Sequence, residues 1–554
     1  YFLITSSIER YPPGATTRVT LRATLAELGL SKASAVYPVG VQVFGTPDAS
    51  SSYTVIGQAT TFITLAGDKR VPVTNLVRLD APPTKLADSL FANEDLAAEL
   101  NPQGDLGRLV KLLDTIGPLD GYAIDPALLD EIADMANGYE VVLDDGLKPG
   151  TGQAHATAWL RKYRMLKGTG VRTLFANPDL NSKDCAKLVE NAMAAKSPIA
   201  TGLPLVVIPP RFEASADNVA AAAAAKFDAV LAANLRDSGA LKQAGKQRVL
   251  ALTTADSHAT LLAAQYQLAQ TFVAGAAGQL RLIAQPQDAA KWAEVTQPWM
   301  QTRPFAQLLE EEPTATARFA KFEAQTLTDA GLSRIANAGK EINTYADLVA
   351  DAKSAIGGPE LLARAASSSW IGNEAGQKAY LGQLSGLIGS KALNAAVEIQ
   401  AVRRFLMSSE ANEFPITVTN KLSEPIEVKI TTESLNPQRL QVPDSQVVLI
   451  EPGVSQVVNI HPHSDSNGVI EVLSHVTTTS GARVSKDVRI TISVTNLSFV
   501  GWAIVIVSGG AVVLLTALRI RQKRQGDSEP GEATFDTPAA SDSAAAPTTP
   551  PPPA

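Results

Sequence analysis

The sequence predicts a multidomain protein with a mixed α/β region, two all-β regions and a single C-terminal transmembrane helix. Three observations lead to this fold class. Between about residues 70 and 300, short apolar runs alternate with helical patterns, which is typical of a mostly parallel sheet. Before this region, and again after the helical stretch that follows it, β-branched residues recur at every second position, as in half-buried strands. One long uncharged apolar run lies near the C-terminus.

Length, charge and cysteine content limit the possible function classes. The 554 residues suffice for roughly three or four folded units, and the 45% hydrophobic content is ample for their cores. A net charge of −7 with no long basic run outside residues 519–524 argues against a nucleic-acid partner. Cys185 is the only cysteine, so no intrachain disulfide can form.

The N-terminal region, residues 1–68, is predicted to be a partial β-sandwich. The stretches "TTRVTLRATL", "YPVGVQVFGT" and "YTVIGQATTFITL" alternate at period two and are separated by Gly, Pro and Ser. The chain begins at Tyr1 without a basic segment or a cleavage site. We therefore expect that a signal peptide and the first strands are missing from this sequence.

Residues 70–300 are predicted to form a barrel-like (β/α) domain. Six apolar runs each precede a helical stretch: "VTNLVRLDAP", "DGYAIDP", "VRTLFANPD", "PLVVIPP", "QRVLALTTAD" and "GQLRLIAQPQD". An open doubly wound sheet and an incomplete barrel both fit six such units. We favour the barrel because each run ends in polar residues and most reach a proline, as loops at a barrel's C-terminal face do. The alanine-rich stretch "NVAAAAAAKFDAVLAANL" is expected to be helical.

Two further regions follow before the membrane segment. Residues 301–410 carry apolar positions at i, i+3, i+4 and i+7, which predicts a helical region, including "LNAAVEIQAVRRFLM". Residues 414–495 contain short, evenly spaced strand patterns such as "FPITVTN" and "DVRITISVTN". This spacing predicts an immunoglobulin-like β-sandwich without its disulfide, directly before the membrane.

A single transmembrane helix is predicted over residues 497–518, "LSFVGWAIVIVSGGAVVLLTAL". These 22 uncharged residues span about 33 Å as a helix, enough to cross a bilayer core. Trp502 is expected to anchor one interface, and a basic cluster follows the helix at Arg519, Arg521, Lys523 and Arg524. Because positive residues stay on the cytoplasmic side, we expect residues 1–496 outside the cell.

The remaining residues, 519–554, form the basic flank and a Pro/Ala-rich segment expected to be a disordered cytoplasmic tail.

Three aspartates at predicted strand ends are the candidate catalytic residues, Asp80, Asp125 and Asp179. Asp125 lies directly before Pro126 and a helical pattern. Aspartate is a favoured N-cap and proline is favoured at the first helical position, so capping explains both residues. The alternative is that two of the three carboxylates flank a glycosidic bond, which needs no histidine.

No metal or cofactor is expected. The turn "LDDG" at 143–146 is similar to one in polysaccharide deacetylases, but those enzymes also need two histidines four residues apart to bind the ion. None of the five histidines has that spacing: His155, His258, His461, His463 and His475. The glycines of "PGTGQAHATAWL" and "KGTG" complete no phosphate-binding motif and are only a weak anion-site signal.

Five motifs precede the terminal membrane span in this order: "YAIDPALLDEI", "GTGQAHATAWL", "PWMQTRPFAQLL", "SSSW" and "FPITVTNKLSEPIEV". In these motifs and in the order of its parts, the chain resembles an uncharacterised family of actinobacterial membrane-anchored surface proteins. It implies two sandwiches around a barrel-like domain akin to polysaccharide deacetylases or glycosidases. It also implies an envelope role, since genes of such proteins often neighbour the flippase that exports lipid-linked peptidoglycan precursor. It brings no catalytic residue.

The sequence thus favours a non-catalytic, single-pass envelope protein that binds glycan or a membrane partner, accessory to peptidoglycan precursor export or cell-wall assembly. The partners expected are the lipid bilayer and peptidoglycan or the flippase. An active glycan hydrolase that uses two of Asp80, Asp125 and Asp179, and a purely structural stalk, remain alternatives.

Overall fold

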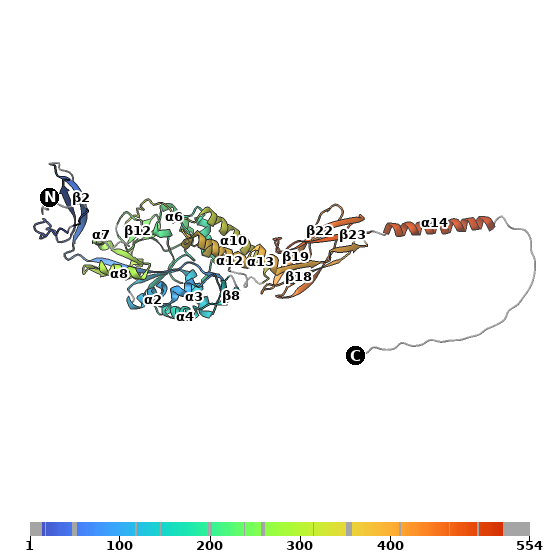
Figure 1. Cartoon of the computed structure of the whole chain (residues 1–554), viewed down its shortest axis with the longest axis horizontal. Helices are drawn as coiled ribbons and strands as arrows, with labels where there is room; N and C mark the ends of the chain where they lie inside the picture. The colour runs from blue at the N-terminus through green and yellow to red at the C-terminus, as the bar shows by residue number, and fades with distance from the viewer. Residues whose placement is uncertain are drawn as a thin grey trace, which may run out of the picture.

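A computed structural model describes residues 14–523, except for short gaps at 17, 47–51, 117–118, 144–145, 198, 200–201, 238, 256–260, 314, 351–356, 409–411, 465 and 496–497. Its parts follow one another along one long axis, as Figure 1 shows: a β-hairpin, an α/β unit with attached helices, a β-sandwich and a separate helix. The two ends of the described chain therefore lie at opposite ends of the molecule.

The N-terminal part is a hairpin, whereas the sequence predicts a partial sandwich. Strands β1 (Ala35–Gly45) and β2 (Thr54–Leu65) pair with each other antiparallel. In the described residues no second sheet covers this pair, and Val41, Phe44 and Ile56 are therefore about half exposed. The hairpin instead packs against α7 (Leu261–Ala274), where the Phe62 and Tyr266 rings lie 5.8 Å apart.

Seven parallel strands form the central sheet of the α/β unit. They are β3 (Val71–Leu79), β6 (Gly121–Ile124), β9 (Thr169–Arg172), β10 (Val206–Val207), β11 (Ala229–Ala232), β13 (Gln247–Thr253) and β14 (Gln279–Ile283). Their order is β10-β11-β13-β14-β3-β6-β9, and every neighbouring pair is parallel. A parallel bridge from Arg172 to Leu205 joins the two outer strands. The sheet thus closes as a barrel-like ring, with seven strands instead of the eight of a complete (β/α) barrel.

Each of the six predicted apolar runs overlaps one of these strands, but β11 lies in the alanine-rich stretch that the sequence predicts to be helical. Only its first part is helical, as α6 (Ala216–Ala222), and the chain then turns at Lys226, whose φ is +49°. All four residues of β11 are fully buried, since strands flank it on both sides. A short strand buried on both faces has no period-two pattern, so periodicity cannot distinguish it from a helix.

Helices and short strands surround the ring. The other helices of the unit are α1 (Asp95–Leu100), α2 (Asp105–Ile116), α3 (Pro126–Asn137), α4 (Gln153–Arg164), α5 (Cys185–Ala194) and α8 (Pro286–Glu294). Strands β12 (Leu241–Ala244) and β15 (Met300–Thr302) pair with β13 and β3. A separate small sheet contains β4 (Lys85–Ala87), β5 (Leu90–Phe91), β7 (Glu140–Leu143) and β8 (Gly146–Pro149).

The amino ends of the ring are plugged by α9 (Phe305–Glu310). Phe305 and Leu308 are fully buried and join the apolar core formed by side chains of the ring strands. The Phe305 ring lies so close to Gly121, the first residue of β6, that an added Cβ would sit 2.3 Å from it. This plug leaves the carboxyl ends of the strands as the open end of the ring.

The attached helices end earlier than the sequence predicts. They are α10 (Asp329–Leu348), α11 (Gly358–Ala365), α12 (Glu374–Ile388) and α13 (Ser390–Ala396), and two strands, β16 (Val397–Ala401) and β17 (Arg404–Met407), follow instead of further helix. In β16 the buried residues Val397 and Ile399 alternate with more exposed ones. Apolar spacing over so few residues fits both periods, which explains the wrong prediction.

Residues 397–494 form a β-sandwich. One sheet contains β16, β18 (Phe414–Asn420) and β21 (Ser455–Ile460), and the other contains β17, β23 (Val488–Val494), β22 (Gly468–Thr477), β19 (Ile426–Ser434) and β20 (Val448–Ile450). Their inner faces share one core, which includes Ile416 and Val418 from the first sheet and Ile430, Val472 and Ile490 from the second. That core continues into the attached helices.

The end of α10 joins the helices firmly to the sandwich. The Asp347 carboxylate accepts hydrogen bonds from the Thr479 hydroxyl at 2.7 Å and the Ser480 amide at 3.0 Å. Burial tends to raise the pKa of Asp347, but hydrogen bonds from Ser480, Thr478 and Thr479 outweigh it and lower the pKa to about 2. The carboxylate therefore stays charged at neutral pH and keeps these bonds.

The last described element is α14 (Ser498–Lys523), the only helix in the described residues that is long and apolar enough to cross a membrane. Its stretch Ala503–Arg521 has a mean hydropathy of 2.2, and no part of it is buried against the rest of the protein. Trp502 and Lys523 belong to this helix, Arg519 and Arg521 are exposed on it, and Arg524 and the tail lie outside the described residues. This helix supports the predicted membrane span.

Candidate functional site

A cavity of about 330 Å³ lies at the open end of the ring, which we call the strand-end cavity. Its walls come from the ends of β3 and β6, the loops after β9 and β10, and a segment between α11 and α12. The polar residues lining it are Arg78, Asp80, Asp125, Asn177, Arg211, Gln325, Ser367, Ser368 and Ser369. Ligands of parallel α/β sheets bind outside the carboxyl ends of the strands, so the cavity is the candidate site.

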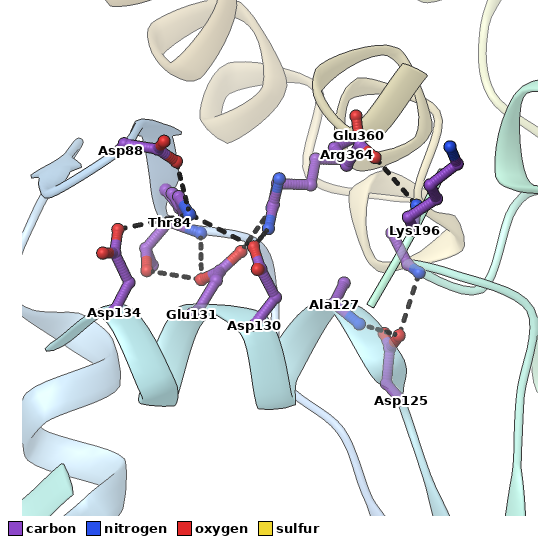
Figure 2. A network of polar contacts seen from close by, with 12 residues as sticks. Thr84, Asp88, Asp125, Ala127, Asp130, Glu131, Asp134, Lys196, Glu360 and Arg364 are labelled. Atoms are coloured by element: carbon purple, nitrogen blue, oxygen red, sulfur yellow. Dashed lines mark hydrogen bonds and ion pairs between the residues drawn. The ribbon is translucent and has the colours of Figure 1, made fainter. Parts of the chain in front are cut away.

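Asp125 caps helix α3, as the sequence predicts, and also lines the strand-end cavity. One carboxylate oxygen accepts the Ala127 amide at 2.9 Å, and Pro126 occupies the first helical position. The same oxygen accepts the Ala176 amide at 2.9 Å, and the other accepts the Asn177 side-chain amide at 3.3 Å. Figure 2 shows the carboxylate at the start of the helix with two of these bonds.

The environment of Asp125 weakens its acidity. Burial is the largest cause and raises the pKa of the carboxyl to about 7, and the charges of Asp80 and Glu131 add to this. The Ala127 and Ala176 amides oppose the shift because they stabilise the charged form. Asp125 is therefore about half protonated at neutral pH.

Replacing Asp125 with asparagine should remove a pH-dependent loss of stability. The folded carboxyl keeps its proton up to about pH 7, whereas an ordinary one releases it near 3.8, so stability falls as the pH rises between these values. Asparagine caps helices as well as aspartate but does not titrate. Thermal unfolding of the full chain in detergent at pH 4.5 and 7.5 measures this, and the decrease between these pH values should be smaller in Asp125→Asn. An equal decrease in both proteins would contradict the assignment.

Asp80 lies in the same cavity as Asp125. Its carboxylate forms an ion pair with Arg78, two residues earlier at the end of β3. The Arg78 guanidinium also lies 5.2 Å from the centre of the Phe212 ring. The fold thus brings together two of the three predicted acids, one paired with an arginine and one buried.

Asp179 does not line the strand-end cavity. It is fully buried and accepts the Leu327 amide at 2.8 Å and the Asn181 amide at 3.0 Å. Burial raises the pKa of this carboxyl, against the opposing effect of its hydrogen bonds. Asp179 therefore ties the loop after β9 to the segment that precedes α10.

Backbone strain concentrates beside the strand-end cavity. Of the six described non-glycine residues with positive φ, four lie here: Ala176 (+59°), Asn177 (+44°), Arg211 (+53°) and Phe212 (+59°). Such conformations cost about 1–3 kcal/mol each and persist where the surroundings enforce them, often at functional sites. Arg211 is exposed, and no ion-pair partner for it occurs in the described part of the chain.

The outer wall of the cavity comes from the "SSSW" segment. The Ser368 amide donates to the Asn177 carbonyl at 2.8 Å, and the Ser367 and Ser369 hydroxyls are 2.9 Å apart. The Trp370 indole donates to the Arg364 carbonyl at 2.8 Å and fixes the segment to α11. Sequence reasoning missed Arg78, Asn177, Arg211 and these serines as site residues, although the repeated serine was a usable signal.

A buried ion network fixes α11 against α3 (Figure 2). The Arg364 side chain is 2% exposed and contacts Glu131 at 2.8 Å and Asp130 at 2.5 Å. The Lys85 ammonium lies 3.2 Å from Asp130 and 3.2 Å from Asp134. The acidic part of "YAIDPALLDEI" therefore holds the helices that carry the cavity wall, while Asp125 begins the same helix at the cavity.

The remaining motifs have structural roles or lie outside the described residues. Asp144, Asp145 and His258 fall in the gaps, and the described residues contain no group of three potential metal ligands. Gly150 and Gly152 permit close packing instead of anion binding, because an added Cβ would lie 2.2 Å and 2.8 Å from Tyr139. Tyr139 donates to Glu94 and accepts the Gly152 amide at 3.0 Å.

Cys185 is buried at the start of α5. Burial and, to a lesser extent, the charge of Asp179 raise the pKa of its thiol to about 11. At neutral pH the thiol is protonated and poorly nucleophilic.

Comparison with known proteins adds a family similarity over part of the chain. Residues 295–539, less than half of the sequence, match the family described as Family of unknown function (DUF6049). A search of the curated proteins finds no match.

Solved structures show only remote likeness. A FixG-related protein from Vibrio parahaemolyticus matches at 14% identity over 18% of this chain and 96% of that chain, with a TM-score of 0.15. The C. elegans MSP family member WR4 matches at 6% identity over 18% of this chain and 98% of that chain, with a TM-score of 0.15. PapD-like domain 7 of human CEP192 matches at 15% identity over 19% of this chain and 87% of that chain, with a TM-score of 0.14. Such low TM-scores support no argument about function.

Proposed function

We propose that the protein is a membrane-anchored, extracytoplasmic envelope protein that binds an anionic glycan in the strand-end cavity without cleaving it. The observation that carries this proposal is the polar cavity at the open end of the ring, which is lined by Arg211, an arginine without an ion-pair partner among the described residues. Peptidoglycan is the ligand class that fits, because its sugars carry hydroxyls and its peptide stems carry carboxylates.

The charges around the cavity support an anionic ligand. Arg78 and Asp80 neutralise each other, and Asp125 carries only part of a negative charge near pH 7. Arg211 then leaves the cavity with a positive charge, and its guanidinium can bind a carboxylate through two parallel hydrogen bonds. The serine hydroxyls and the Asn177 and Gln325 amides supply the donors and acceptors that sugar hydroxyls need.

The arrangement of the chain supports the envelope location. Helix α14 can span the bilayer, and the basic residues after it favour a cytoplasmic C-terminus. The sandwich and the continuous core of the attached helices then hold the cavity away from the membrane surface. The resemblance of the chain to surface proteins encoded beside the precursor flippase supports an accessory role in cell-wall assembly or precursor export.

Sedimentation with purified, insoluble peptidoglycan tests binding. The full chain in detergent should co-sediment, and Arg211→Ala should reduce the bound fraction because the carboxylate loses its cationic partner. A charge-assisted hydrogen bond contributes about 1.5–3 kcal/mol, so the loss should be about tenfold or more in affinity. Arg161→Ala, an exposed arginine on α4 away from the cavity, is the matched control. Equal binding by both variants would contradict the proposed site.

A glycan hydrolase is the second candidate, because Asp80 and Asp125 share the cavity and differ in environment. Glycosidases use such a pair, with the acid of raised pKa as proton donor and the ionised one opposite it. Binding without cleavage is favoured because both Asp125 oxygens already accept hydrogen bonds that hold α3 and the loop after β9. New reducing ends that disappear in Asp80→Asn and in Asp125→Asn would establish the hydrolase instead.

A further inference from the structure

The outer face of the five-stranded sheet carries two exposed apolar side chains at its end nearest α14. Leu406 on β17 and Val469 on β22 both pair with Ser493 of β23, one on each side. Paired residues of neighbouring strands point to the same face, so the three side chains form one row. Leu406 is 64% and Val469 is 67% exposed, which is unusual on a sheet face that water would cover.

The next row of the same face is polar. Arg404 and Glu471 flank Thr491, and Arg489 follows two residues earlier on β23. Arg489 pairs with Glu471 at 3.1 Å, whereas Arg404 has no ion-pair partner in the residues that the structure describes. The face therefore changes from apolar to cationic with increasing distance from α14.

A groove of about 720 Å³ lies beside this face, at the edge where the chain crosses from β16 to β17. Arg403 and Arg404 line it, both are exposed, and neither has an ion-pair partner in the described ranges. The acid in the groove, Asp487, is already paired with Arg483. Two cations are thus free to bind anionic groups next to the apolar row.

The row lies close to the start of the membrane helix. Ser493 is five residues before Ser498, where α14 begins, so at most about 17 Å of extended chain separates them. Figure 1 shows the β23 end of the sandwich facing α14. A surface with apolar side chains toward the lipid and arginines behind them matches the interface of a bilayer that contains anionic phospholipids.

We infer that the sandwich docks on the outer surface of the bilayer through Leu406 and Val469, with Arg403 and Arg404 on the phosphates of anionic lipids. This inference rests on the proposed membrane anchoring by α14. Docking would fix the tilt of the whole extracytoplasmic part and so the height at which the strand-end cavity faces the cell wall.

Lipid quenching of site-specific fluorophores tests the docking in the full chain. The protein is reconstituted in nanodiscs of phosphatidylcholine and phosphatidylglycerol that contain spin-labelled lipid, with single labels at Leu406→Cys or Val469→Cys. Cys185 is buried with a raised pKa, so it competes little for the label. The matched control is Val457→Cys, an exposed valine on the other sheet, and Val507→Cys in α14 reports insertion.

Labels at 406 and 469 should be quenched, and the label at 457 should not. Changing both Arg403 and Arg404 to glutamine should decrease the docked-to-free ratio by about fivefold for each arginine, and discs without phosphatidylglycerol should have the same effect. Quenching at 507 without extra quenching at 406 and 469 would overturn the docking alone. No quenching at 507 would overturn the anchoring and the docking with it, and insensitivity to the arginines would overturn their assigned role.

Discussion

Replacing Arg364 with alanine should decrease the free energy of unfolding by about 3–5 kcal/mol, because the change leaves Glu131 buried without its charged partner. Burial alone would lower the pKa of Arg364, but the charges of Glu131 and Asp130 raise it above its usual value, so the guanidinium stays charged. The Thr84 amide and hydroxyl still bind the other Glu131 oxygen, at 3.0 and 2.8 Å, but they supply no positive charge.

Thermal unfolding of the full chain in detergent measures the effect, together with amide exchange in α3 and α11. Arg334→Ala is the matched control, since that arginine pairs with the half-exposed Glu374 and should cost only about 0–1 kcal/mol. Arg364→Lys should recover part of the lost stability, because lysine keeps the positive charge but lacks the planar guanidinium that binds both acids. A loss for Arg364→Ala no larger than that for Arg334→Ala would show that the network does not hold the two helices together.

Replacing Phe305 with alanine should also cost about 3–5 kcal/mol, because it empties the plug of the ring. The ring of Phe305 contacts the start of β6 so closely that only glycine fits at position 121. Gly121 has no side chain that could move into the space left by the Phe305 ring, so a cavity should remain.

The control for this change is Phe44→Ala in the N-terminal hairpin, where the phenylalanine is 52% exposed. That substitution should change stability by about 0.5 kcal/mol or less. Both variants are compared by thermal unfolding of the full chain at one pH. Equal melting temperatures for Phe305→Ala and the unmodified protein would contradict the plugged, closed ring.

The sequence predicted the elements with strong local signals. The Asp125 cap follows from the aspartate–proline pair alone, and the structure contains the expected bond to the Ala127 amide. The apolar run of α14 and the alternating pattern of the sandwich strands are also local sequence signals, and both were predicted. Strand β11 and the early strands β16 and β17 were missed because four or five residues carry too little periodicity to separate strand from helix.

The strand-end cavity could be predicted only in part. Asp80 and Asp125 follow strands of the same parallel sheet, so their proximity follows from topology, whereas Asp179 lies seven residues beyond the end of β9 and points elsewhere. Arg211 and Ser367 join the site from segments that lie 34 and 190 residues beyond Asn177 in the sequence. The left-handed backbone at Arg211 has no sequence signature, because arginine rarely adopts it, whereas Asn177 is of a residue type that is enriched there.

One titration tests whether the strand-end cavity binds an anionic glycan through Arg211. Soluble peptidoglycan fragments with free carboxylates, and the same fragments with amidated carboxylates, are titrated into the full chain and into Arg211→Ala. Amidation should weaken binding to the unmodified chain by about tenfold or more and have little effect on Arg211→Ala. Equal affinity of the unmodified chain for both fragments would contradict the claim.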